Sequence, residues 1–366
     1  MGMKHITNKI VLLSVIFVLA GCEVLSSNKS AEPEQIIAAS WNVQALFDGR
    51  ESGNEYEEYR QGAGWTPEKY KARINAISQA IQQMVQSDKT AVPDIIGLVE
   101  LENAGVLEDL AKGGLSKYSY KWTAFSSIPG LSIGLGILSR FPITDMRSHS
   151  ITIGDETAPR PVLEVRIEPR GEPLVFLLCH WKSKTGKDTE GLRRASARVV
   201  HRRLVELNQK EEGTPVIIMG DLNENYNEFY LESTLSALLP DDPKAAALAA
   251  KAVNPRGSPD FLVLSGEKPP LSQHIKNVLA LYSPWGVELS DGSYYYRDKW
   301  ETIDHFLLSE ALFGGTGWMF SDCRVLNHEP FTTSNGTPNR YIPRNGNGLS
   351  DHLPLLLYLR YSGIGE

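Results

Sequence analysis

The segment VIIMGDLNEN (216–225) places an apolar run directly before a carboxylate and an amide. Asp221 and Asn223 are two residues apart, so on an extended chain their side chains face the same way. Carboxylate and amide oxygens suit Mg²⁺ or Mn²⁺ as ligands better than they suit zinc. The pattern indicates a polar site at the end of a buried strand.

The other main apolar runs carry the same types of polar residue at one end. Some of these residues follow their run and others precede it, and in antiparallel neighbours a start and a finish lie at the same edge of a sheet. We therefore expect all of them to converge on one rim. Any one of them alone is typical of a turn or a core histidine, so the prediction depends on the set. Besides Asp221 and Asn223, the set comprises Asn42, Glu100, His180, Asp304, Asp351 and His352.

These residue types fit one reaction well. Two histidines can exchange protons near neutral pH. A phosphodiester is anionic and repels nucleophiles, and its leaving oxygen needs a proton or a neutralising charge. A divalent cation and a base–acid pair supply those functions. The set therefore predicts metal-assisted hydrolysis of a phosphoester.

The elements that must position these residues alternate between strands and helices. Strands are expected from about Ile36 and over 93–103, 174–183 and 214–225, and the runs 132–140 and 160–169 are expected to pair with each other. A helix is expected over 64–86, with Thr66 as its N-cap and Pro67 in its first turn. A second, basic helix is expected over 191–209. This alternation predicts mixed sheets packed in layers.

The N-terminal segment predicts export rather than fold. A positive start precedes an apolar run over 10–20, which is too short to span a bilayer and suits a secretory signal. The box LAGC (19–22) then indicates a lipoprotein whose mature chain begins at a lipidated Cys22; an ordinary signal with a chance cysteine is the alternative. We expect residues 1–21 to be a signal peptide, 22–35 a polar tether, and the protein to be located in the cell envelope, outside the cytoplasm.

The net charge limits how a phosphate-rich partner can bind, and the cysteines indicate whether a disulfide forms. The net charge of −7 excludes a phosphate-rich partner held by overall charge, so a local basic patch or a metal must hold it. Export would permit a disulfide between Cys179 and Cys323, but the apolar run around Cys179 favours a buried free thiol.

Six motifs resemble, in order, the motif series of the endonuclease/exonuclease/phosphatase superfamily, which includes deoxyribonuclease-like enzymes. They are WNVQ, GLVELEN, LLCHWKS, MGDLNE, TIDH and LSDHLPL. The resemblance spans about Ile36 to Tyr361. It implies one domain over 36–361 with a four-layer α/β sandwich fold, in which two mixed, mostly antiparallel sheets pack face to face with helices outside.

The resemblance also implies roles. His352 is the general base that activates water, Asp304 orients it, and His180 approaches the phosphate as a possible acid. Asp221 and Asn223 orient the nucleophile and hold the phosphate. The metal ligands, for Mg²⁺ or Mn²⁺, are Asn42, Glu100 and Asp351.

The chain departs from the deoxyribonuclease branch beside His180. There a glutamate on a neighbouring strand partners the first histidine, whereas Arg160 and Pro161 stand at the corresponding place here. The departure weakens the acid role of His180 but not its role in phosphate binding. Arg160, Lys182 and Arg194 are candidate contacts for the substrate phosphate, with a solvated basic surface as the alternative.

The leading hypothesis is a lipid-anchored, Mg²⁺-dependent nuclease whose partners are nucleic acid and, through Cys22, a membrane. No protein partner is predicted. A phosphatase or a phospholipid phosphodiesterase of the same fold is the first alternative, and a binding lipoprotein without catalysis is the second.

Overall fold

The protein is described by a computed structural model over residues 33–85, 91–153, 156–158, 160–187, 189–252 and 258–363. The expected signal peptide, Cys22 and most of the expected tether lie outside these residues. None of the helices in these ranges has the length and apolarity needed to cross a bilayer.

Six strands form the first sheet, in the order β17-β18-β1-β2-β4-β3. β1 and β2 run parallel, and the other neighbouring pairs are antiparallel. The bounds are β17 Gly317–Val325, β18 Leu355–Ser362, β1 Gln35–Leu46, β2 Ile95–Leu101, β4 Gly134–Ser139 and β3 Trp122–Ser126.

Eight strands form the second sheet, in the order β11-β12-β13-β16-β10-β9-β8-β5. The pairs β9–β10, β11–β12 and β12–β13 are parallel, and the other pairs are antiparallel. The bounds are β11 Leu238–Pro240, β12 Leu262–Ser265, β13 Ala280–Tyr282, β16 Asp304–Leu308, β10 Val216–Asp221, β9 Leu174–His180, β8 Val162–Ile167 and β5 Ile143–His149. Two small hairpins stand apart: β6 Thr152–Ile153 with β7 Glu156–Thr157, and β14 Tyr294–Tyr296 with β15 Lys299–Glu301.

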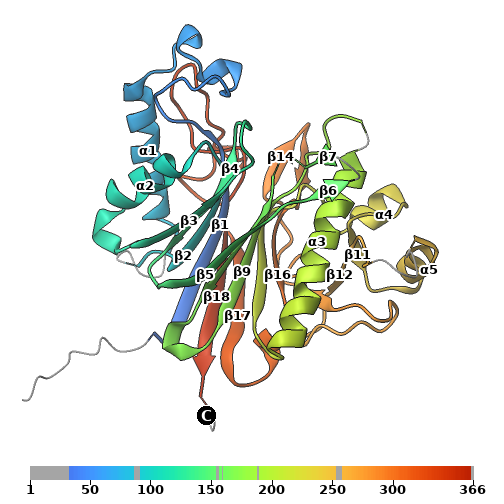
Figure 1. Cartoon of the computed structure of the whole chain (residues 1–366). Helices are drawn as coiled ribbons and strands as arrows, with labels where there is room; N and C mark the ends of the chain where they lie inside the picture. Colours follow the sequence, from blue (N-terminus) through green and yellow to red (C-terminus); the bar gives the residue numbers. More distant parts are fainter. Residues whose placement is uncertain are drawn as a thin grey trace, which may run out of the picture. The chain divides into compact units, whose positions relative to one another are not determined.

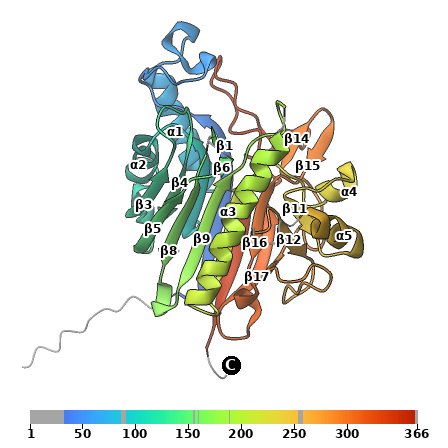
Figure 2. The ribbon, with the colours of Figure 1, turned by 45° about the vertical axis from the view of Figure 1, so that its right-hand side comes forward.

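Helices cover the outer faces of both sheets (Figure 1). α1 (Pro67–Ile81) and α2 (Ala104–Lys112) pack on the first sheet, and α3 (Thr189–Lys210) packs on the second (Figure 2). α4 (Glu228–Glu232) and α5 (Pro243–Ala252) lie beside β11 and β12. Along β1, Ile37 and Ala39 face the helices, while Ile36 and Ala38 face the second sheet, because side chains alternate along a strand. The predicted four-layer sandwich is confirmed.

The first predicted helix begins as expected. The hydroxyl of Thr66 accepts a hydrogen bond from the Lys69 N–H at 3.3 Å, and Pro67 is the first helical residue. The helix ends at Ile81, earlier than the expected residue 86. Cys179 and Cys323 are buried free thiols, which confirms the preference for thiols over a disulfide.

One predicted strand pair is wrong. The runs 132–140 and 160–169 form β4 and β8, which belong to different sheets. β8 pairs instead with β5, a half-exposed strand that includes Asp145, Arg147 and His149. Its polar character hid it in the sequence, because an edge strand with one face in water carries only a weak apolar signal.

A buried ion pair fastens α3 to β8. Arg203 donates to both carboxylate oxygens of Glu164 at 2.6 and 2.7 Å, and Glu164 is 4% exposed. Burial raises the pKa of Glu164, but hydrogen bonds from His149 and Arg203 outweigh it and hold the pKa at about 2, below the ordinary 4.5. The pair therefore contributes stability that is complete above about pH 4.5 and is lost as the pH falls toward 2.

We expect Glu164→Ala to lower the free energy of unfolding by about 3 kcal/mol at pH 7, because it leaves a buried guanidinium without its main partner. Urea unfolding at pH 7 and at pH 3.5 measures this, and the gap between the variant and the wild type should shrink at the lower pH. Glu108→Ala, which breaks an exposed pair with Lys112, is the control and should cost less than about 1 kcal/mol. An equal effect of the two substitutions would contradict the prediction.

Candidate active site

The polar strand ends meet where the two sheets face each other. Asn42 lies in β1 and Glu100 in β2 of the first sheet, and Asp221 ends β10 of the second. The Asn42 amide donates to Glu100 Oε1 at 3.2 Å and to Asp221 Oδ2 at 3.0 Å. A single amide therefore links one carboxylate from each sheet.

Strand register places a row of site residues across the second sheet. Asp304 and His180 lie directly opposite Asp221 on its two neighbouring strands. His180 Nε2 is 3.6 Å from Asp221 Oδ2 and 3.7 Å from Glu100 Oε1. Asp304 starts its antiparallel strand where Asp221 ends its own, as the sequence argument requires.

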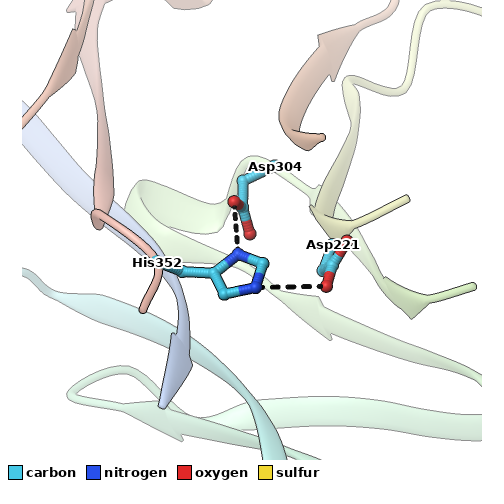
Figure 3. A group of neighbouring side chains, drawn as sticks. All are labelled: Asp221, Asp304 and His352. Atoms are coloured by element: carbon cyan, nitrogen blue, oxygen red, sulfur yellow. Dashed lines mark hydrogen bonds and ion pairs between the residues drawn. The ribbon is translucent and has the colours of Figure 1, made fainter. Parts of the chain in front are cut away.

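His352 and Asp304 form a hydrogen-bonded dyad that faces Asp221 (Figure 3). His352 Nδ1 is 2.8 Å from Asp304 Oδ2, and His352 Nε2 is 3.9 Å from Asp221 Oδ2. The Ser293 hydroxyl donates to the same oxygen of Asp304 at 2.7 Å. The imidazole is thus oriented through Nδ1, which leaves Nε2 toward the centre of the cluster.

Loop contacts hold His352 in this position. Its N–H donates to the Ser350 hydroxyl at 3.1 Å, and that hydroxyl donates to the Asn42 carbonyl at 2.6 Å. The Trp41 indole donates to the His352 carbonyl at 3.0 Å. The ring of Tyr294 lies against the imidazole, with 4.5 Å between ring centroids. The motifs in the sequence did not predict these supporting roles of Ser350, Trp41 and Tyr294.

Acidic neighbours shift the titration of the dyad. Burial lowers the pKa of His352, but the carboxylates of Asp304, Asp221 and Asp351 outweigh it and raise this pKa to about 10. Burial raises the pKa of Asp221 to about 7, an increase that Asp304 reinforces and His352 opposes. The cluster therefore holds more buried negative charge than its own histidines neutralise.

Several site residues adopt left-handed backbone conformations. The φ angles are 69° at Glu100, 51° at Asn223, and 51° and 53° at Gln44 and Ala45. These turns let backbone N–H groups reach the site: Ala45 donates to Glu100 Oε2 and Asn223 donates to Asp221 Oδ1, both at 2.8 Å. Such conformations cost about 1–3 kcal/mol each and cluster at functional sites.

Gly220 precedes Asp221 for a steric reason. Its φ is +125°, and a Cβ built on it would lie 2.0 Å from the Cys179 carbonyl oxygen. We expect Gly220→Ala to lower the free energy of unfolding by more than about 2 kcal/mol, because both the backbone and the adjacent strand must move. Thermal unfolding measures this, with Gly213→Ala on an open turn as the control; its φ of +83° carries a strain cost without the clash. Equal losses for the two variants would refute the steric account.

His180 lacks the carboxylate partner found in the deoxyribonuclease branch. Its Nδ1 is buried without a hydrogen-bond partner among the described residues. Glu164, on the neighbouring strand β8, bonds Arg203 and His149 instead. Burial, and then the charges of Arg160, His352 and Lys182, lower the pKa of His180 well below its ordinary value, so it is a neutral imidazole at pH 7.

The three candidate phosphate contacts differ in placement. Arg160 donates to the Trp181 carbonyl at 3.2 Å and acts on the pKa of both His180 and Glu100, so it lies beside the cluster. Lys182 also acts on His180 and bonds the Thr185 carbonyl at 3.0 Å. Arg194 instead pairs with Asp260 at 2.7 Å and is not brought to the cluster by any contact of the described residues.

Asp351 lies beside a cation, Arg340, that the sequence pattern did not predict. Its N–H donates to Gln44 Oε1 at 3.0 Å, and its Oδ2 is 3.9 Å from Arg340 Nη2. Asp351 raises the pKa of Glu100, although burial of Glu100 is the larger cause. The charge of Asp351 therefore acts on Glu100, which is consistent with their expected role as ligands of one metal ion.

The donor set fits a hard divalent cation. The buried carboxylate of Asp221 and the partly exposed carboxylate of Glu100 come from different sheets and share the Asn42 amide. The pKa of each is raised, and a cation would neutralise this charge. Asp221, Asp304 and His352 offer ligand atoms within 4.8 Å of one another. The His352–Asp304 bond already engages two of these groups. Both oxygens of Glu100 and the amide oxygen of Asn42 also accept hydrogen bonds, so the expected ligand set of Glu100, Asn42 and Asp351 stays a prediction.

Comparison with known proteins agrees with this geometry. The sequence profile of the Endonuclease/Exonuclease/phosphatase family matches residues 37–256. The chain belongs to this family. Its members are phosphoester hydrolases that depend on divalent metals. None of the curated proteins matches the sequence significantly.

Solved structures of this family share the fold at low sequence identity. Truncated Caenorhabditis elegans TDP2 has 14% identity and a TM-score of 0.50, covering 89% of this chain and 98% of its own. D. rerio TDP2 humanized by 14 mutations has 17% identity and a TM-score of 0.52, covering 90% of this chain and 100% of its own. At such identities the likeness establishes the fold alone.

Proposed function

We propose that this protein is a divalent-metal-dependent phosphodiesterase that hydrolyses nucleic acids. The observation that carries the proposal is the His352–Asp304 dyad, whose imidazole faces a cluster of carboxylates from both sheets. A general base next to a cation site, with Arg160 beside it, suits an anionic ester that water attacks in line.

Each residue has a role in this chemistry. Asp304 holds the imidazole through Nδ1, so that Nε2 of His352 accepts the proton of the attacking water. Asn223 and neutral His180 supply hydrogen bonds to the phosphate, and Arg160 supplies positive charge. A cation bound by Glu100, Asn42 and Asp351 would polarise the phosphate and, by neutralising the carboxylates, lower the pKa of His352 toward that of a working base.

A panel of substrates tests the proposal. The purified protein is assayed with Mg²⁺ on plasmid DNA, single-stranded DNA, RNA, sphingomyelin and inositol phosphates, each with and without EDTA. We expect EDTA-sensitive cleavage of a nucleic acid that Asp221→Ala abolishes. Hydrolysis of only sphingomyelin or inositol phosphates would replace the nuclease assignment by the alternative, and the absence of any turnover would refute catalysis.

We further propose that the enzyme is anchored in the cell envelope through a lipid on Cys22, as the box LAGC (19–22) suggests. Labelling of expressing cells with a fatty-acid probe, followed by membrane fractionation, tests this. The wild type should carry the label in the membrane fraction, and Cys22→Ser should lose it. Equal labelling of the two proteins would refute the anchor.

A further inference from the structure

A pocket of about 310 Å³ opens directly beside Glu100. The residues that line it include Glu100, Gln44, Tyr56, Arg340 and Ile342. Its volume is at the small end of the range of about 300–1,000 Å³ that is typical of ligand sites, which corresponds to one small ligand rather than a long chain. The catalytic roles proposed above do not assign a function to this pocket.

The walls of the pocket are held in place by the fold. The Gln44 side chain donates to the Tyr341 carbonyl and accepts from the Tyr341 N–H, both at 2.9 Å. The guanidinium of Arg73, which is 2% exposed, lies 3.7 Å from the centre of the Tyr341 ring. The left-handed backbone of Gln44 and Ala45 forms part of the same wall. A ligand would therefore meet a pre-formed site.

Tyr56 joins the pocket to the catalytic cluster. Its ring packs edge-on against Phe47, with 5.2 Å between ring centroids. Burial raises the pKa of its hydroxyl, and the nearby charge of Arg160 opposes this shift. The residue is nevertheless 37% exposed, so part of its ring is open to a ligand. The exposed ring of Tyr56 therefore lies next to Arg160, the expected contact for the substrate phosphate.

Arg340 places a positive charge at the pocket and makes only a weak ion pair within the described residues. Its side chain is 66% exposed, and its 3.9 Å contact with Asp351 is a long, exposed ion pair of small energetic value. It lines the pocket beside Glu100. Because Glu58 and Glu100 also line this pocket, a lipid acyl chain would meet charge there, which disfavours a phospholipid tail as the occupant.

We propose that this pocket binds the nucleotide unit next to the scissile phosphate, with the base against Tyr56 and the flanking phosphate on Arg340. An aromatic face and an arginine are the pair of groups that recognise a base and its phosphate without strict sequence preference. The inference rests on the proposed function, since it names the unit of nucleic acid that lies on the Glu100 side of the site.

Calorimetric titration tests the pocket independently of turnover. Thymidine 3′,5′-bisphosphate, which carries both phosphates of the unit, and inorganic phosphate are each titrated into the full-length protein with Mg²⁺, and the ratio of the two Kd values measures the preference for the nucleotide. We expect the wild type to prefer the nucleotide. Tyr56→Ala and Arg340→Ala should each reduce that ratio about tenfold, whereas Tyr56→Phe, which keeps the ring, should retain most of it.

Two matched controls complete the experiment. Tyr230→Ala removes an exposed tyrosine of α4, and Arg344→Ala removes an exposed arginine of the loop that carries Arg340. Both should keep the wild-type ratio. Equal affinity of the wild type for the two ligands, or an unchanged ratio in Tyr56→Ala and Arg340→Ala, would overturn the inference. The substrate panel reports separately on the proposed function.

Discussion

The variant His352→Ala is expected to lose about 10²–10⁴-fold in kcat while it keeps the wild-type fold. Nε2 of the imidazole faces the carboxylate cluster, 3.5 Å from the Asn42 amide nitrogen and 3.9 Å from Asp221 Oδ2, and Nδ1 is held by Asp304. Removal of the imidazole leaves water without a positioned proton acceptor. Steady-state hydrolysis of the best substrate from the panel measures the loss, and circular dichroism with thermal unfolding checks the fold.

A double-mutant cycle separates this role from a structural one. Asp304→Asn keeps the shape of the side chain but weakens the orientation of the imidazole and should lower kcat in the same direction. If Asp304 acts through His352, the double variant is no slower than His352→Ala alone, because residues that act as a unit are not additive. Additive losses, or a His352→Ala enzyme as fast as the wild type, would contradict the assigned base. His274→Ala, at an exposed position, is the control.

Removal of the metal is expected to abolish activity, and Glu100→Gln is expected to raise the Mg²⁺ or Mn²⁺ concentration needed for half-maximal activity at least about tenfold. The physical reason is charge: burial and Asp351 raise the pKa of Glu100, so a nearby cation would stabilise its carboxylate form. A metal that binds the folded state also stabilises it. Mn²⁺ should therefore raise the Tm of the wild type more than that of the variant.

The matched control is Glu102→Gln, two residues further along the chain. Glu102 accepts a hydrogen bond from the Asp48 N–H at 2.6 Å and makes none with the catalytic cluster among the described contacts. Its metal dependence should match that of the wild type. Calorimetric titration with Mn²⁺ gives the binding constants directly, and equal constants for Glu100→Gln and the wild type would exclude Glu100 as a ligand.

The sequence was sufficient to predict which strand ends meet, and physical reasons explain why. Asn42, Glu100, His180 and Asp221 each follow an apolar run, and strand alternation fixes the direction of each side chain. His305 follows Asp304 directly, and strand alternation turns it to the opposite face. Its Nε2 lies 2.8 Å from the Glu224 carbonyl oxygen, outside the cluster.

Residues held by loops could not be predicted in this way. Ser293, Ser350 and Arg340 reach the site from segments without periodicity, so their positions depend on tertiary packing alone. On α3, Arg194 was expected near the phosphate, but the adjacent Arg193 is the one that turns inward and bonds the Lys182 carbonyl and Glu224. Adjacent helical residues point about 100° apart, and composition does not reveal which one faces the protein.

The amide of Asn42 bridges carboxylates that belong to different sheets. The reacting groups are therefore held at the interface between the two sheets and not on a single sheet. The two sheets approach closely along this interface, where a Cβ on Gly97 would come within 2.6 Å of the Met219 methyl. Slippage of one sheet past the other would therefore misalign the reacting groups before either sheet melts. Heat should therefore inactivate this enzyme at a temperature below that of global unfolding. Bulky substitutions between the two sheets should lower activity although they lie away from the reacting groups.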